Sequence, residues 1–146
     1  MVIYISADHA GYKLKEYIKK YFIKKNIHFV DLGAYSDKEQ DDFPDFAVKV
    51  AKKMSKDKKS KGILICGTGT GMAMAANRIK GARAALAYDK YSAVMSRRDN
   101  DANILCLRGR ETSFENQKKI VSYWLETDFS NIARYKRRIK KLEKIK

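Results

Sequence analysis

The sequence predicts an α/β fold built on a parallel sheet of five strands, and three observations lead to this prediction. Short apolar runs rich in Val, Ile and Leu alternate with longer amphipathic stretches, which is the pattern of repeated β-α units. The chain has 146 residues, the length of one ordinary domain. No internal repeat or low-complexity linker divides it, so we expect a single domain over residues 1–146.

Five apolar runs are the expected strands, and the segments between them are the expected helices. The strands are predicted at residues 2–6, 28–32, 62–66, 83–87 and 103–107. In the first intervening segment, Leu14, Ile18 and Phe22 repeat at the spacing of one helix face. Pro44 suits the first turn of a second helix. Further helices are expected at residues 72–79, 89–98 and 114–125, with a last, basic helix around residues 132–142.

The composition is strongly basic, with a formal net charge of +15, and a basic chain suggests nucleic-acid binding. However, the lysines spread along the expected helix faces, a distribution typical of a solvated surface. We therefore expect no nucleic-acid partner.

No apolar run approaches the roughly 18 residues that cross a bilayer. No export signal is recognisable, so we expect a cytoplasmic protein that does not engage a membrane.

A glycine-rich loop follows the third expected strand, in the order Cys66-Gly67-Thr68-Gly69-Thr70-Gly71. Glycines at alternate positions let the backbone expose successive N–H groups, and a helix N-terminus after them makes a cradle for an anion. Such donors favour the thiolate of Cys66, which could then act as a base or nucleophile. The alternative is that Cys66 is simply a small buried residue completing its strand. Cys106 lies inside an apolar run without such a loop, and we assign it to the core.

The glycine loop does not match the loops that bind nucleotides or transfer phosphoryl groups. Met72 stands where a dinucleotide fingerprint needs glycine, and the Gly-Lys-Ser/Thr of a Walker loop is absent. Met72 also stands where a cysteine phosphatase would need arginine. A cysteine beside an oxyanion cradle suits proton abstraction next to a carbonyl, and this chemistry needs no cofactor.

Other candidate residues lie at strand ends and on the last helix. Asp8 and His9 follow the first strand and suit hydrogen bonds to sugar hydroxyls or proton transfer, although a helix-capping aspartate with an incidental histidine fits equally. No set of His, Cys and carboxylate residues has the spacing of metal ligands, so we expect no metal. Arg134 and Arg138 share one helix face and could bind a phosphate as a pair, or could belong to a solvated basic face.

Over nearly its whole length the chain resembles the B-type ribose-5-phosphate isomerases and their relatives that isomerise galactose 6-phosphate and allose 6-phosphate. The cysteine-glycine block and a second block around Asn100 and Asp101 carry most of the resemblance. The other matching motifs are Ser6-Ala7-Asp8-His9-Ala10-Gly11, Asp42-Phe43-Pro44-Asp45, Ala75-Ala76-Asn77, and Tyr91-Ser92 through Ser96-Arg97.

The resemblance implies a Rossmann-like three-layer α/β/α sandwich with an extended C-terminal helix, working as a homodimer whose active sites are shared between subunits. It makes Cys66 the base that moves a proton between C2 and C1 of a sugar phosphate. The residues it assigns to the enediolate cradle are Gly67, Thr68, Gly69, Thr70 and Gly71. Those it assigns to the sugar are Asp8, His9 and Asn100. Those it assigns to the phosphate are Arg110, Arg134 and Arg138, and His9 could also lie near the phosphate.

The chain departs from this family at three positions near the expected ligand. Asp99 replaces a histidine to which the family assigns opening of the furanose ring. We hypothesise that Asp99 substitutes for it, although Asp8 or His9 could do so, or the open-chain sugar could form spontaneously. Phe43 replaces a common tyrosine, and Tyr135 replaces a common histidine beside the first arginine of the last helix.

Three alternatives to a ribose 5-phosphate isomerase remain open at this point. The substrate could be a hexose 6-phosphate such as galactose or allose 6-phosphate. The basic segment from Arg134 to Lys146 could bind nucleic acid, which predicts a steep salt dependence. Finally, the missing histidine could mark a sugar-phosphate sensor that binds its ligand without turnover.

Overall fold

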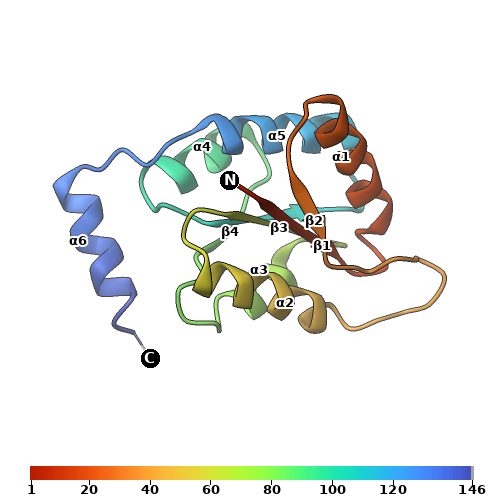
Figure 1. Cartoon of the computed structure of the whole chain (residues 1–146), viewed down its shortest axis with the longest axis horizontal. Helices are drawn as coiled ribbons and strands as arrows, with labels where there is room; N and C mark the ends of the chain where they lie inside the picture. The colour runs from red at the N-terminus through yellow and green to blue at the C-terminus, as the bar shows by residue number, and fades with distance from the viewer. Residues whose placement is uncertain (146) are drawn as a thin grey trace.

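The computed structural model describes residues 1–145 and contains one five-stranded parallel sheet (Figure 1). The strand order is β2-β1-β3-β5-β4, and every neighbouring pair runs parallel. The strands are β1 (Ile3–Ala7), β2 (Phe29–Asp31), β3 (Lys61–Cys66), β4 (Ala84–Leu86) and β5 (Ile104–Arg108). The α/β fold and the five strands predicted from the sequence are confirmed, with each strand end within one residue of its predicted position.

Helices cover both faces of the sheet and complete three layers (Figure 1). One face carries α1 (Tyr12–Lys24), α4 (Lys90–Arg98) and α5 (Phe114–Glu126), and the other carries α2 (Phe43–Lys56) and α3 (Thr70–Ala76). Pro44 lies in the first turn of α2, as its sequence position predicted. The last helix, α6 (Ala133–Leu142), stands away from both layers.

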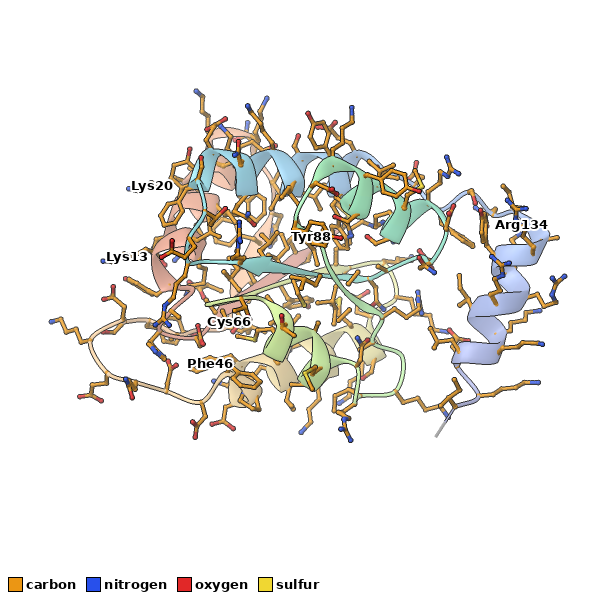
Figure 2. All side chains as sticks on the ribbon, turned by 180° about the vertical axis from the view of Figure 1, so that it is seen from behind. Lys13, Lys20, Phe46, Cys66, Tyr88 and Arg134 are labelled. Carbon is orange, nitrogen blue, oxygen red and sulfur yellow. The ribbon has the colours of Figure 1, made fainter. Side chains whose placement is uncertain are left out.

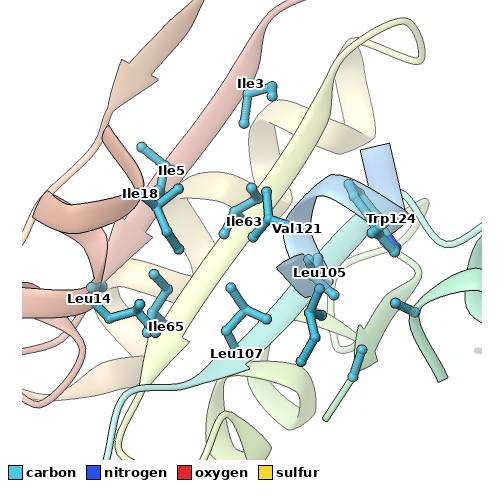
Figure 3. Close-up of a cluster of buried hydrophobic side chains, with 14 of the residues drawn as sticks. Ile3, Ile5, Leu14, Ile18, Ile63, Ile65, Leu105, Leu107, Val121 and Trp124 are labelled. Atoms are coloured by element: carbon cyan, nitrogen blue, oxygen red, sulfur yellow. The ribbon is translucent and has the colours of Figure 1, made fainter. Parts of the chain in front are cut away.

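The central strands are apolar on both faces because helices cover both faces. Side chains of successive strand residues point to opposite sides, so Ile63 and Ile65 pack under α1 and α5 while Leu64 packs under α2 and α3. Figure 3 shows the first of these two clusters, with Trp124 of α5 closing one end. This double burial explains why the strands read as continuous apolar runs rather than alternating ones.

Helix α3 lies earlier in the chain than the predicted 72–79, since it begins at Thr70 and ends at Ala76. The side chain of Asn77 accepts a hydrogen bond from Ala84 N at 2.8 Å and donates one to Ala84 O at 2.9 Å. These two bonds tie the end of α3 to the start of β4, and the chain turns towards that strand instead of continuing the helix.

Helix α6 has few contacts with the rest of its own chain (Figure 1). Arg83 forms an ion pair of 3.3 Å with Glu143, and Ser130 N donates to Arg98 O before the helix begins. Ile132 and Leu142 are 45% and 52% exposed, while the ring of Tyr135 is buried. An amphipathic helix that leaves its apolar residues in solvent is incompletely packed within one chain. Among residues 1–145, no helix has the length and apolar character needed to cross a membrane.

A buried ion pair anchors the long loop between β2 and α2. The Lys15 side chain is fully buried, and its Nζ donates to Asp31 Oδ1 at 2.7 Å and to the carbonyl of Ala34. Lys19 Nζ binds the other oxygen of Asp31 at 2.7 Å. Burial would raise the pKa of Asp31, but the hydrogen bonds from the two lysines outweigh it and lower that pKa below its usual value.

The Asp31→Asn substitution should lower the free energy of unfolding by about 3 kcal/mol at pH 7, because it leaves the buried ammonium group of Lys15 without its counter-charge. A carboxylate with a lowered pKa stabilises the fold above its unfolded pKa of about 3.9, and this stabilisation is lost as the pH falls through the folded value. The difference between the two proteins should therefore shrink below about pH 4 in urea titrations.

The matched control is Asp37→Asn, which removes an exposed partner 3.8 Å from Lys13. Its unfolding free energy should stay within about 0.5 kcal/mol of the parent value. Equal effects of the two substitutions would contradict the anchoring role of the buried pair.

Candidate active site

Three loops meet at the carboxyl edge of the sheet, and backbone hydrogen bonds tie them together. Asp8 N, at the end of β1, donates to Ile65 O at 3.1 Å. Gly109 N, after β5, donates to Cys66 O at 2.8 Å, and Arg110 N donates to Gly67 O at 3.1 Å. These bonds bring the sequence-predicted residues Asp8, His9, Cys66 and Arg110 to one place, since the carboxyl ends of neighbouring parallel strands share an edge.

Cys66 is the last residue of β3, and its Sγ accepts a hydrogen bond from Gly69 N at 3.1 Å. The side chain is 5% exposed and its inner side touches the core beneath α2 and α3. Gly69 adopts φ +81°, a conformation that side chains other than glycine rarely take. This turn aims a backbone donor at the sulfur, which is a contact that stabilises a thiolate.

Cys106 provides the internal comparison for Cys66. It is fully buried in β5, and burial, together with the nearby Cys66, raises the pKa of its thiol far above the ordinary range. The assignment of Cys106 to the core is confirmed. Both cysteines are free thiols.

The backbone beyond Cys66 offers further donors to an anion. Within residues 1–145, the N–H groups of Thr68 and Gly71 have no acceptor, whereas Thr70 N is turned back to Thr68 Oγ1 at 3.3 Å. The side chain of Arg110 lies over Gly67, where an added Cβ would be 3.5 Å from its Cδ. The loop therefore combines free amides and a guanidinium group beside the sulfur, an arrangement that stabilises an oxyanion.

Asp8, His9 and Asp41 form a polar cluster next to this loop. Asp41 Oδ1 accepts from His9 Nδ1 at 2.8 Å and from His9 N at 2.9 Å. Asp8 Oδ1 accepts from Gly11 N at 2.9 Å. Burial raises the pKa of Asp8, and the nearby Asp41 carboxylate adds to this, against the opposing effects of the Gly11 bond and His9.

The same three residues are the one group of potential metal ligands in the described part of the chain, with ligand atoms within 4.8 Å of one another. Asp41 Oδ1 binds the His9 ring and Asp8 Oδ1 binds Gly11 N, so hydrogen bonds hold part of the cluster.

The remaining sequence-predicted residues form a second group at the opposite side of the molecule. Asp99 and Asn100 follow α4 and lead into the amino end of β5, where Asn103 O accepts from Gly62 N at 2.8 Å. Arg134 and Arg138 of α6 lie 4.9 and 5.7 Å from the ring centre of Tyr135, so they share a face as predicted. Figure 2 shows Cys66 and Arg134 at well-separated parts of the molecule.

Sequence reasoning missed two residues that the structure adds to these groups. Arg98 donates from Nε to Asp99 Oδ1 at 3.1 Å, and its positive charge lies near the hydroxyl of Tyr135, to which Arg134 Nη2 donates at 3.1 Å. Asp41 binds His9 across 32 positions of sequence. The only sequence signal for Asp41 is its place directly before the Asp42-Phe43-Pro44-Asp45 motif, in a loop where acidic residues are common.

Fold and site define an α/β protein with a thiol and an oxyanion cradle at the carboxyl edge of a parallel sheet. Comparisons with known proteins specify the class. A family model described as Ribose/Galactose Isomerase matches residues 3–142. A probable ribose-5-phosphate isomerase B of Mycoplasma pneumoniae is 41% identical over 140 residues, covering 96% of this chain and 91% of the relative. Ribose-5-phosphate isomerase B of Escherichia coli is 35% identical, covering 98% and 95%.

Solved structures agree with the sequence comparisons. The crystal structure of a ribose 5-phosphate isomerase from Thermotoga maritima superimposes with a TM-score of 0.94 at 43% identity, covering 99% of this chain and 98% of that one. The Mycoplasma genitalium ribose-5-phosphate isomerase B, solved with bound ribulose-5-phosphate, gives a TM-score of 0.93 at 41% identity, covering 97% and 93%. The chain therefore belongs to the ribose/galactose isomerase family.

The Gly69→Ala substitution should lower kcat at least about 10-fold, because the added methyl group would both oppose the positive φ and displace the amide that faces Cys66. Its Cβ would lie 2.6 Å from Leu86 Cδ1 and 2.9 Å from Leu107 O. Gly81→Ala is the control, since Gly81 has φ +87° but only ordinary contacts, the nearest at 3.5 Å. It should cost about 1 kcal/mol of stability and leave kcat unchanged. A similar loss of kcat in both variants would argue against the donor role of Gly69.

Proposed function

We propose that the protein interconverts ribose 5-phosphate and ribulose 5-phosphate through an enediolate, with Cys66 as the base. The observation that carries the proposal is the hydrogen bond from Gly69 N to Cys66 Sγ inside a loop that offers further free amides. Two family relatives support the substrate, one by its name and one by the ribulose-5-phosphate bound in its structure.

In the proposed reaction the Cys66 thiolate removes the proton from C2 of the open-chain aldose. The electron pair moves into a C1–C2 double bond, and the carbonyl oxygen on C1 becomes an oxyanion that the backbone donors of residues 67–71 stabilise. The thiol then returns the proton to C1, while the C2 hydroxyl loses its proton and becomes the ketone. The C1 oxygen gains a proton, so no proton is consumed overall.

We further propose that two copies of the chain assemble and that each active site uses residues of both. Asp99, Asn100, Arg134 and Arg138 lie on the side of the molecule away from Cys66, so a second copy is the natural source of these groups. Helix α6 leaves its apolar residues exposed, which suits packing against another subunit. Arg110 of one chain and the α6 arginines of the other would then bind the phosphate.

The two free cysteines suit a reducing compartment, and we propose that the protein works in the cytoplasm. Asp8 and His9 would hold sugar hydroxyls at the carboxyl edge, while Asn100 would reach the sugar from the partner. Asp99, bound to Arg98, would enter from the same side.

Cys66→Ala should lower the rate of conversion of ribose 5-phosphate to ribulose 5-phosphate at least about 100-fold, because general-base catalysis contributes on this scale. The rate is measured without added metal from the appearance of the ketose. Cys106→Ala is the matched control, since it removes the other thiol from the same sheet, and it should keep kcat within about 2-fold. Undiminished turnover in Cys66→Ala would refute the proposed base. Faster turnover of galactose or allose 6-phosphate by the parent would move the assignment to a hexose.

Mixing two inactive variants tests the shared site. Cys66→Ala and the double variant Arg134→Ala/Arg138→Ala should each be nearly inactive alone. After dissociation and reassembly in equal amounts, half of the dimers carry one intact site, so about a quarter of the parent activity should return. Sites built from one chain would regain no activity on mixing, and that result would reject the shared arrangement.

A further inference from the structure

We infer that Asp41 is a positioning residue that orients the imidazole of His9 for the proton transfer that opens the sugar ring. This inference rests on the proposed function, because it concerns the step that must precede enediolate formation. Ribose 5-phosphate exists mainly as a closed five-membered ring, and the carbonyl needed for isomerisation appears only when that ring opens. Neither the cysteine nor its amide cradle accounts for this step.

Asp41 holds His9 at two points. One carboxylate oxygen, Oδ1, accepts from the ring nitrogen Nδ1 at 2.8 Å and from the backbone N–H of the same residue at 2.9 Å. The backbone N–H of Asp41 also points at Nδ1, at 3.3 Å, a contact in which Nδ1 would accept. The contact with the carboxylate is shorter and a carboxylate accepts, so we assign the proton to Nδ1, which leaves Nε2 for the substrate. The side chains of His9 and Asp41 are 23% and 24% exposed, so the pair lies at the surface of the site, within reach of a sugar.

The loop that carries Asp41 is itself fixed at its other end. Lys15 binds Asp31 and the carbonyl of Ala34 at the start of this loop, and α2 begins just after Asp41. A carboxylate on a loop held at both ends fixes the imidazole with little freedom, which is what a proton-transfer group requires.

The charged groups near His9 are the carboxylates of Asp8 and Asp41, with Arg110 close to the same loop. The His9 ring lies with the carboxylates of Asp8 and Asp41, and the ligand atoms of the three residues are within 4.8 Å of one another. An added Cβ on Gly67 would be 3.6 Å from Arg110 Nη1 and 3.7 Å from Ala10 Cβ, so the guanidinium group of Arg110 lies close to the loop of His9. The two carboxylates stabilise the protonated imidazole that proton transfer produces. Of the two histidines in the chain, only His9 lies at the carboxyl edge, since His28 precedes β2 at the other end of the sheet.

One imidazole can carry both proton transfers of ring opening. The anomeric hydroxyl on C1 loses its proton to Nε2, the C1–O4 bond breaks, and its electron pair goes to O4 as the C1 carbonyl forms. The imidazolium, with its Nδ1 proton still bound by Asp41, then gives a proton to O4. The carboxylate stabilises the charged ring during the transfer and keeps the ring nitrogen aimed at the substrate.

The reverse reaction distinguishes a role in ring opening from a general structural role of Asp41. Ribulose 5-phosphate cannot close a five-membered ring because the oxygen on C5 carries the phosphate, so it reaches the enzyme as an open chain. In the reverse direction the open-chain aldose can leave the enzyme and close in solution. A defect in ring opening should therefore slow the reaction from ribose 5-phosphate and spare the disappearance of ribulose 5-phosphate. The two initial rates are measured separately, with kcat and KM determined in each direction.

Asp41→Asn should lower kcat from ribose 5-phosphate by about 10-fold and Asp41→Ala by about 100-fold, because the amide keeps the hydrogen bond without the charge. Initial rates from ribulose 5-phosphate should stay within about 2-fold of the parent. With Asp41→Ala, the forward rate should also stop rising with enzyme concentration, since it becomes limited by spontaneous ring opening. Glu39→Gln, an exposed change in the same loop, should alter neither direction.

His9→Gln should show the same dependence on direction, and combining it with Asp41→Asn should add little further loss, because both act through one group. Equal losses in both directions, or a rise in KM without a fall in kcat, would overturn the inference and leave Asp41 a loop anchor or a ligand-binding aid. A forward-only loss in Asp99→Asn with full activity in Asp41→Ala would also overturn it, in favour of Asp99. Failure of the parent to convert either sugar would instead refute the proposed function.

Discussion

The site depends on one constraint, the close approach of three backbone segments at the carboxyl edge of β1, β3 and β5. A Cβ on Gly11 would collide with Ile65 O, and one on Gly109 would lie 2.8 Å from Ala10 O. Only glycine allows the loops to come this close, and the resulting hydrogen bonds place Cys66 between the loop of His9 and that of Arg110. The chemistry thus rests on backbone packing more than on any single side-chain contact.

The same topology explains why one chain holds only part of the proposed site. A strand followed by a helix in a parallel sheet returns the chain to the amino edge, so the end of α4 and the segment leading to α6 lie far from Cys66. The arginines of α6 nevertheless lie against Tyr135, and Asp99 is bound to Arg98, whose positive charge lies near the same tyrosine. In the proposed dimer, one chain supplies the residues around Cys66 and the second chain supplies the group around Tyr135, so residues of both chains enclose each active site.

Much of the fold could be read from the sequence because its signals are local. Continuous apolar runs gave the doubly covered strands, and the spacing of Leu14, Ile18 and Phe22 gave α1. The end of α3 could not be read, since it depends on the bonds between Asn77 and Ala84 rather than on propensity. In the site, the Cys66 loop was visible as a contiguous motif. Asp41 was not, because its bond to His9 joins two loops that only the folded sheet brings together.

The distribution of charge around the site favours one orientation of the proposed substrate. The carboxylates of Asp8 and Asp41 lie beside His9, while Arg110 lies over Gly67 and the α6 arginines would join it from the partner. A phosphate dianion is drawn to the arginines, so the uncharged end of the sugar falls towards Cys66. Proton transfer to carbon and to oxygen can then occur at adjacent atoms of a sugar that is held at its far end. Because the phosphate is held by charge, the reacting carbons C1 and C2 are positioned without direct contacts of their own to a cofactor.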